Sequence, residues 1–127
     1  MEYRELGKTG LQISSICLGT MNFSNPVSET DSIEMLHWAL DSGINFIDTA
    51  DVYEGYDRFL GSPGGKAEII IGQGLTGRRS DAIITTKVGN HIGDATYDGK
   101  GLGKQHVMRQ IEKSLRRMNT DYIDIYE

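Results

Sequence analysis

The stretch Asn45-Phe46-Ile47-Asp48-Thr49-Ala50-Asp51-Val52-Tyr53 decides the fold of this chain. It begins with a short apolar run that stops at a carboxylate, the pattern of a buried strand with polar residues at its C-terminal end. Runs of the same kind occupy residues 15–19, 82–87 and 121–126. Helical patterns lie between these runs, and this alternation predicts parallel strands joined by right-handed crossovers.

The sequence also indicates where the helices begin and end. The first helix is expected to start near Ser28, which can form a capping box with Asp31, and to stop at Gly43. A short helix weakened by glycine is predicted around residues 67–75. Ahead of the first strand, residues 3–13 are typical of a small hairpin, which we expect to cover the bottom of a barrel. The last helix has one apolar face, formed by Val107, Ile111, Leu115 and Met118.

Three stretches resemble phosphate-binding loops, but none has the required context. Residues 72–77 match the dinucleotide fingerprint, yet that fingerprint must open a helix, and here residues 78–81 lead into another strand. Residues 61–67 lack the leading glycine of a P-loop, because position 60 is Leu60. The hairpin turn at residues 7–9 fails for the same reason. We therefore interpret all three as structural loops or helix.

Composition and charge restrict the classes of protein to consider. The chain has 127 residues, about one domain, with 38% hydrophobic and 24% charged residues, close to the soluble globular average. Proteins that bind nucleic acid usually carry a basic patch that contacts the phosphates, so the net charge of -5 argues against a nucleic-acid partner. The charged start and the lack of a long apolar run favour neither a secretory signal nor a membrane span, so we expect a cytoplasmic location. The single cysteine, Cys17, is expected to be a small buried apolar side chain.

Asp48, Tyr53 and Lys87 are the candidate catalytic residues. Each follows the end of a predicted strand, and the C-terminal ends of parallel neighbours lie on one rim, so the three side chains can meet. An ammonium beside a phenol stabilises the phenolate and makes the phenol a better proton donor to a carbonyl oxygen. The carboxylate would hold the ammonium in place. Taken singly, each residue also has a purely structural interpretation. Asp48 could form a turn or a helix cap, Tyr53 could be a half-buried aromatic of a loop, and Lys87 could be a solvated residue at the end of a strand.

Four motifs together resemble the aldo-keto reductases: Gly19-Thr20-Met21, residues 45–53, Ile84-Thr85-Thr86-Lys87 and residues 114–124. The resemblance implies a (β/α)₈ TIM barrel that uses a nicotinamide nucleotide, usually NADPH with NADH possible, to reduce an aldehyde or ketone to an alcohol. It also implies the following residue roles. Tyr53 would be the general acid supported by Asp48 and Lys87, and the residues near the nicotinamide and its ribose would be Gly19, Thr20, Met21 and Asp48. No metal is implied.

The chain departs from the family pattern in its length. A TIM barrel needs about 250 residues, so residues 1–127 correspond to one incomplete domain, an N-terminal hairpin plus about four βα units. The family's catalytic histidine follows the fourth strand, and His37, His91 and His106 do not match its position. The phosphate-holding loops of the last strands are absent too. We therefore expect the isolated chain to lack carbonyl reduction and to self-associate through its open sheet edge.

Two other functions stay open at this stage. One is a non-catalytic, redox-sensing or regulatory subunit of the same family. The other is a complete small doubly wound α/β domain that binds a ligand at its strand ends. The sequence leaves open which carbonyl compound is the substrate, and whether the glycine-rich residues 93–103 form a flap over the site or a linker.

Overall fold

The computed structural model describes residues 1–93 and 101–127. Most of the glycine-rich segment predicted to be a flap or a linker lies outside these residues. Two 3-10 helices, η1 (Gly55–Asp57) and η2 (Arg79–Asp81), accompany the main elements. In chain order, the strands and α-helices are β1 (Tyr3–Glu5), β2 (Gln12–Ser14), β3 (Cys17–Gly19), α1 (Glu29–Asp41), β4 (Phe46–Asp48), α2 (Lys66–Gly74), β5 (Ile83–Thr86), α3 (Lys104–Arg117) and β6 (Ile125–Tyr126).

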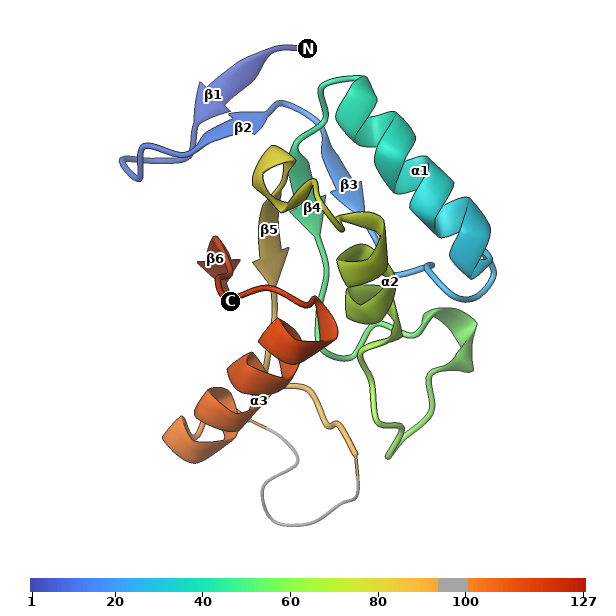
Figure 1. Ribbon diagram of the computed structural model, residues 1–127. Coiled ribbons are helices and arrows are strands. Elements are labelled where there is room, and N and C mark those ends of the chain that lie inside the picture. The colour runs from blue at the N-terminus through green and yellow to red at the C-terminus, as the bar shows by residue number, and fades with distance from the viewer. Residues whose placement is uncertain (94–100) are drawn as a thin grey trace.

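The main sheet has four parallel strands in the order β3-β4-β5-β6. Leu18, Ile47 and Ile84 are paired across the first three strands. Figure 1 shows all three α-helices on one side of this sheet, where α1 packs on α2 and α2 on α3. A doubly wound domain needs a reversal of strand order with helices on both faces, so the strand order contradicts that alternative. The predicted parallel α/β architecture is confirmed as a strand-and-helix series with no closed barrel among the described residues.

The core lies between the sheet and its helices. Ile47 and Ile84 point from the sheet into a cluster completed by Leu36 of α1 and Ile71 of α2, and all four side chains are fully buried. Burying a side chain of this size contributes about 1.5–3 kcal/mol. This layer therefore fixes which face of the sheet is packed, and leaves the other face for Cys17, Gly19, Phe46 and Asp48, which alternate with the core residues.

The predicted start and end of α1 are confirmed. The Ser28 hydroxyl accepts the amide of Asp31 at 3.1 Å and donates to the Asp31 carboxylate at 2.7 Å, so one orphan amide of the first turn is satisfied. Gly43, just past the helix, has a φ of +86°, a left-handed conformation that favours glycine.

The hairpin covers the end of the sheet opposite the candidate catalytic residues. Asn45, which precedes β4, accepts the amide of Ser14 at 2.7 Å and donates its side-chain amide to the carbonyl of Gln12 at 2.9 Å. These bonds fix β1 and β2, which pair antiparallel, at the N-terminal ends of the parallel strands. The predicted hairpin at the bottom is therefore confirmed.

The burial of α3 and of Cys17 differs from the pattern that the sequence suggests. Of the apolar face predicted for α3, Met118 is buried in the core, whereas the residues at 107, 111 and 115 are only half-buried. The other buried residues of the helix are His106, Gln110 and Ser114. The helix thus turns its polar line inward and leaves its apolar line partly exposed. Cys17 is exposed, because β3 is the outermost described strand and Cys17 lies on the face without helices.

The last strand is shorter than the run at residues 121–126 predicted. The carboxylate of Asp124 accepts the amide of Ile84 at 2.9 Å, where a paired strand would place a backbone carbonyl. A side-chain acceptor therefore takes the place of a backbone acceptor at this point, and β6 begins only at Ile125. Among the described residues, no helix combines the length and apolar character needed to cross a bilayer.

The contact between α2 and α3 requires glycine at position 72. A Cβ atom there would lie 2.7 Å from the backbone of Met118 and 2.8 Å from the carbonyl oxygen of Arg117. Alanine gains about 1 kcal/mol of helix propensity, but overpacking against backbone costs about 1–3 kcal/mol. We expect Gly72→Ala to lower the urea midpoint, while Gln73→Ala, exposed on the same helix, leaves it unchanged. A higher midpoint for Gly72→Ala would contradict this packing.

Candidate active site

The structure brings Asp48, Tyr53 and Lys87 together at the C-terminal rim of the sheet. The Lys87 ammonium contacts the Asp48 carboxylate, donates to the carbonyl of Thr49 at 3.0 Å, and lies 5.2 Å from the centroid of the Tyr53 ring. Asp48 and Lys87 are both partly open to solvent and Tyr53 is half-buried. A small molecule can therefore reach all three from the open side of the rim.

The electrostatics of the rim keep Lys87 charged. Burial alone disfavours the ammonium, but the hydrogen bond and charge of Asp48, followed by the charge and hydrogen bonding of Tyr53, raise the pKa of Lys87 above its usual value. Lys87 is thus a permanent cation at neutral pH. Its position between a carboxylate and a phenol allows it to stabilise negative charge that develops on the phenol oxygen.

Backbone pairing continues past the strands and sets these positions. The amide of Thr49 donates to Thr85 at 2.9 Å, and the amide of Asp51 donates to the carbonyl of Lys87 at 3.2 Å. The carbonyl of Tyr53 accepts the amide of Ala67 at 3.0 Å, at the start of α2. The loop that carries Tyr53 is therefore attached both to the end of β5 and to the first turn of a helix.

The predicted cofactor-binding residues differ in how accessible they are. A Cβ atom on Gly19, which is paired with Asp48, would have no atom within 4 Å, so open space lies at this end of β3. Met21 is 58% exposed and lines a small cavity of about 230 Å³ with Tyr53. Thr20 is fully buried, and its amide and hydroxyl both donate to the carbonyl of Asp48, at 3.0 and 2.9 Å. Thr20 therefore positions Asp48, and its contact with a cofactor stays a prediction.

A buried polar group next to Tyr53 was missed by sequence reasoning. The Glu54 carboxylate is buried and accepts the hydroxyl of Ser62, which accepts Arg58 at 2.9 Å. Arg58 also donates to the carbonyl of His91. This group joins the loop after β4 to the loop after β5, so it fixes the walls on both sides of Tyr53. The sequence contains only a weak sign of this group, namely the spacing of four residues between Glu54 and Arg58. Pairs with this spacing are also common on protein surfaces, so the spacing alone does not predict burial.

A second buried ion pair lies behind the rim. Glu68 is 0% exposed, and its carboxylate accepts the hydroxyl of Thr86 at 2.6 Å and the Nε of Arg117 at 2.6 Å. Thr86 directly precedes Lys87, so the pair fixes the end of β5 to α2 and α3. The sequence did contain a sign that this carboxylate faces inward. Glu68 lies three residues before Ile71, so the two side chains share one face of α2, and Ile71 is buried.

Asp51 is a buried acid beside this group. It is 1% exposed, and one of its carboxylate oxygens has no hydrogen-bond partner among the described residues. Burial first, and then the negative charge of Glu68, raises the pKa of Asp51 to about 7, although Arg117 and Arg58 act in the opposite direction. Asp51 is therefore partly protonated near neutral pH.

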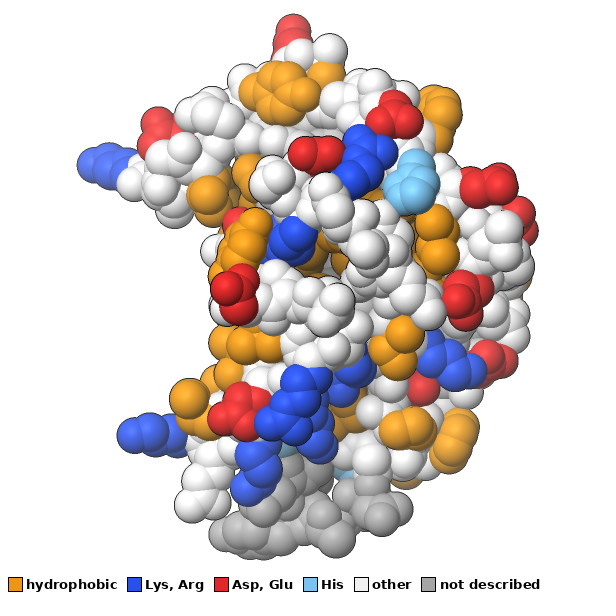
Figure 2. Space-filling view, viewed as in Figure 1, with side chains coloured by type: hydrophobic (Ala, Val, Ile, Leu, Met, Phe, Trp, Pro, Cys, Tyr) orange, Lys and Arg blue, Asp and Glu red, His pale blue; other side chains and the backbone are white. Residues whose placement is uncertain are grey.

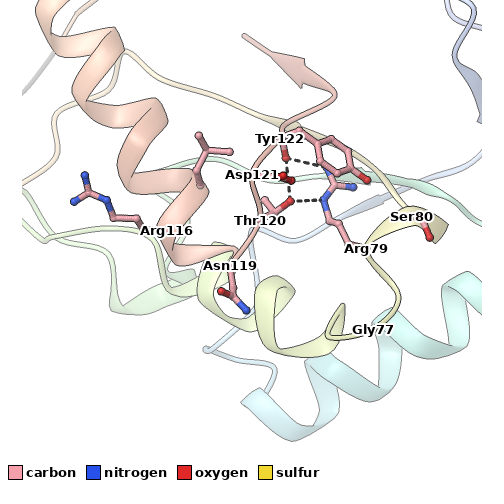
Figure 3. A pocket seen from close by; sticks show the side chains of 9 residues that line it. Gly77, Arg79, Ser80, Arg116, Asn119, Thr120, Asp121 and Tyr122 are labelled. Carbon is pink, nitrogen blue, oxygen red and sulfur yellow. Dashed lines mark hydrogen bonds between the residues drawn. The ribbon is translucent and has the colours of Figure 1, made fainter.

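A hollow at the other rim belongs to the scaffold. It measures about 820 Å³ and lies beside the N-terminal ends of β5 and β6. Figure 3 shows Arg79 pointing at Thr120 and Tyr122 within it. The guanidinium stacks over the Tyr122 ring at 3.9 Å and also pairs with Asp124 at 2.7 Å, so its donors are already used. No group of three His, Cys, Asp or Glu residues in the described ranges is placed to hold a metal ion.

The sheet and its rim are those of a strand-and-helix series from a parallel barrel. A family model described as the aldo/keto reductase family matches residues 15–127. The oxidoreductase YrpG of Bacillus subtilis, itself uncharacterized, is 40% identical over 100% of this chain and 39% of its own length. A "probable voltage-gated potassium channel subunit beta" of Arabidopsis thaliana is 35% identical over 98% of this chain and 36% of its own length.

A solved structure extends the same likeness to the fold. The aldo-keto reductase AKR11C1 from Bacillus halodurans, in its holo form, superposes with a TM-score of 0.80 at 36% identity, covering 99% of this chain and 39% of that protein. The chain thus spans about two fifths of the relatives it matches. It belongs to the aldo/keto reductase family, as its motifs predicted.

The Glu68–Arg117 pair gives a stability prediction with a matched neighbour. Arg117→Ala leaves a buried carboxylate without its cation, a change that typically costs about 3–5 kcal/mol. Arg116 pairs with Glu112 on the exposed side of the same turn, and Arg116→Ala should stay within about 0.5 kcal/mol of the parent. Urea unfolding of both variants measures the difference, and equal effects would show that the buried pair is unimportant.

Asp51 gives a prediction about pH. Its folded pKa lies above the unfolded value of about 3.9, so the protonated form stabilises the fold at low pH, and this contribution is lost as pH rises to about 7. Relative to Asp51→Asn, the parent should therefore lose up to about 1.4 kcal/mol per pH unit between these values and then level off. Urea unfolding of both proteins across this range tests the expectation, and a constant difference would refute it.

Proposed function

We propose that this chain forms the catalytic N-terminal part of an NAD(P)H-dependent oxidoreductase that reduces an aldehyde or ketone to an alcohol. The observation that carries the proposal is the Lys87 ammonium, which lies between the Asp48 carboxylate and the Tyr53 ring at an accessible rim. The family and the fold support an oxidoreductase of this class. The residue roles rest on the geometry of this rim.

In the proposed reaction, Tyr53 donates its hydroxyl proton to the carbonyl oxygen of the substrate. A nicotinamide cofactor, when bound, supplies the hydride for the carbonyl carbon. Lys87 stabilises the phenolate that remains on Tyr53, and Asp48 holds the ammonium in position. The Glu54 and Arg58 group keeps the loop of Tyr53 in place during this transfer. The proton and the charge thus move between groups whose positions the fold has already fixed.

The residues present suit the nicotinamide end of such a cofactor. The open space at Gly19 leaves room for a flat ring beside Asp48, and the exposed Met21 offers an apolar contact near Tyr53. Gly19, Thr20, Met21 and Asp48 are the residues that we propose for this end of the cofactor. NADPH is the first choice and NADH the second. The proposed partner is a small carbonyl compound, without nucleic acid or membrane, in a cytoplasmic setting where reduced nicotinamides are held.

A regulatory role is the second candidate function. It is favoured by one observation, the likeness to a plant protein whose name is that of a potassium channel subunit. A subunit without catalysis would have no need for a phenol next to a charged lysine and a carboxylate. The complete set of Asp48, Tyr53 and Lys87 therefore ranks the enzymatic role first.

A chimera tests the catalytic role. In it, this chain replaces the matching N-terminal part of AKR11C1, the aldo-keto reductase to which its fold is similar. We expect the chimera to consume NADPH with a simple aldehyde, and Tyr53→Phe to lower kcat by about 10²–10⁴-fold, because the proton donor is removed. Tyr56→Phe is the matched control, since Tyr56 lies exposed three residues further on.

The chimera also separates the two candidate functions. An active chimera that is insensitive to Tyr53→Phe would reject Tyr53 as the general acid. A folded chimera that binds NADPH but reduces no carbonyl compound would favour the regulatory role. The chain by itself is expected to show no NADPH consumption.

A further inference from the structure

Asp51 is a buried acid that the proposed reaction does not use. It lies between Asp48 and Tyr53 in the sequence, and its side chain is almost completely buried. One of its carboxylate oxygens has no hydrogen-bond partner among the described residues. A buried polar atom that is left unpaired costs free energy, so an acid of this kind next to a candidate site calls for an explanation.

Two consecutive glycines bring Asp51 close to the ion pair of Glu68 and Arg117. A Cβ atom on Gly64 would lie 2.2 Å from the backbone carbonyl oxygen of Asp51. A Cβ atom on Gly65 would lie 2.2 Å from Cδ of Arg117. Both glycines have a positive φ, of +70° and +83°, which residues with a side chain rarely adopt. The loop before α2 thus packs directly against both the backbone of the acid and the side chain of the arginine.

Charged and titratable groups act on Asp51 from the elements packed against it. Burial raises its pKa first, and the negative charge of Glu68 on α2 raises the pKa further, to about 7. The cations that act in the opposite direction are Arg117 and Lys113 of α3 and Arg58 of the loop after η1. Figure 2 shows lysine and arginine side chains gathered over α3, the helix that supplies two of these cations.

The remaining titratable neighbour is Tyr126 of β6. Burial, followed by the charges of Asp51 and Glu68, raises the pKa of Tyr126 to about 12. The phenol therefore stays protonated where Asp51 titrates. Asp51 is thus the acid of this group whose charge changes near neutral pH.

Arg117 is the cation for which the two buried carboxylates compete. Its Nε donates to the Glu68 carboxylate at 2.6 Å, and a terminal nitrogen donates to the Ser114 hydroxyl at 3.1 Å. A guanidinium has five N–H donors, so it can also bind a second carboxylate. While Asp51 is neutral, Glu68 has the cation to itself. Once Asp51 is ionised, two like charges share one partner, which disfavours the existing pair.

Both carboxyl residues are connected to Lys87. Glu68 accepts the hydroxyl of Thr86, the residue directly before Lys87, at 2.6 Å. The backbone amide of Asp51 donates to the carbonyl of Lys87 at 3.2 Å. Tyr53 follows Asp51 by two residues in the same loop. A displacement of either acid therefore reaches the lysine through one hydrogen bond and at most one peptide unit.

We propose that Asp51 is a positioning residue whose ionisation state sets the place of Lys87. While Asp51 is neutral, Glu68 keeps both Arg117 and the end of β5, and the lysine stays at the rim. Once ionised, Asp51 draws Arg117 away from Glu68, and the end of β5 loses the contact that fixes it. The consequence for catalysis rests on the proposed function, in which Lys87 stabilises the Tyr53 phenolate. Carbonyl reduction is then fast with neutral Asp51 and slow with ionised Asp51.

NMR spectroscopy of the isotope-labelled full chain tests the coupling without any activity. The carboxyl signal of Asp51 should titrate with a midpoint at about pH 7, and the side-chain signals of Lys87 should shift with the same midpoint. Asp51→Asn, which mimics the neutral acid, should remove this midpoint from the signals of Lys87, whereas Asp41→Asn should keep it. Asp41 is the matched control because its carboxylate is 67% exposed on α1.

A further variant tests the competition for the arginine. Glu68→Gln removes the like charge and leaves Arg117 to Asp51 alone, so the midpoint of Asp51 should fall by about 1–3 pH units. Circular dichroism shows whether this buried variant is folded. The titration of the parent against Asp51→Asn does not depend on it.

Kinetics of the chimera with AKR11C1 test the effect on catalysis. Between pH 6 and pH 8, kcat should fall about tenfold, because the neutral fraction of an acid with a pKa of about 7 falls by this factor. KM for the aldehyde should change little, since Asp51 acts on Lys87 and not on the substrate. In Asp51→Asn, kcat should stay nearly constant over this range, and in Asp41→Asn it should fall as in the parent.

Three NMR results would overturn the proposal. They are an Asp51 carboxyl that titrates at its ordinary value of about 3.9, Lys87 signals that do not follow Asp51, and a Lys87 midpoint that persists in Asp51→Asn. The last result would assign the titration to another group, such as His106, which is buried on α3. An active chimera whose kcat has the same pH profile with and without Asp51 would overturn the proposal as well.

The two arms also separate this proposal from the proposed function. A chimera that reduces no carbonyl compound would reject the reaction, and the NMR titration would still decide whether Asp51 positions Lys87. An active chimera in which Lys87 does not respond to Asp51 would leave the reaction in place and reject the positioning role.

Discussion

The structure depends on the parallel register that aligns Gly19, Asp48 and Thr85 across three strands. This register carries every C-terminal strand end to the same rim, and the pairing continues past the strands as far as Lys87. An acid and an amine that are 39 residues apart in the sequence therefore meet in an ion pair. A shift of one residue would turn each side chain to the opposite face of the sheet, so the register is what makes the candidate site possible.

Two carboxylates are buried behind the rim. Their burial costs solvation free energy, and hydrogen bonds and ion pairs offset this cost. Glu68 joins Thr86 and Arg117, which are distant in the sequence. Glu54 pairs with Ser62 and Arg58 within its own loop, and Arg58 carries the link on to the carbonyl of His91. Buried pairs of this kind add little net stability compared with apolar packing, but they are costly to break. Their effect here is to hold the loops around Tyr53 and the end of β5 in one arrangement, which the proposed proton transfer would require.

The open surfaces are explained by the same strand order. A sheet whose strands follow one another in sequence order, with all helices on one side, has two free edges and one free face until eight strands are present. The exposure of Cys17 and Trp38 and the half-burial of the apolar line of α3 all lie along these edges or this face. They are consequences of one architecture.

The sequence by itself determined the order of the elements, the capped start of α1, the family, and the three residues that meet at the rim. Those features depend on local periodicity, capping and motif spacing, which short stretches of chain carry. Only the tertiary structure decided that Glu54, Glu68 and Asp51 are buried, that α3 turns its polar line inward, and that Asp124 shortens β6. These features depend on which distant segments come into contact, and the free energy of a buried polar group is set by partners that its own neighbours in the sequence do not reveal.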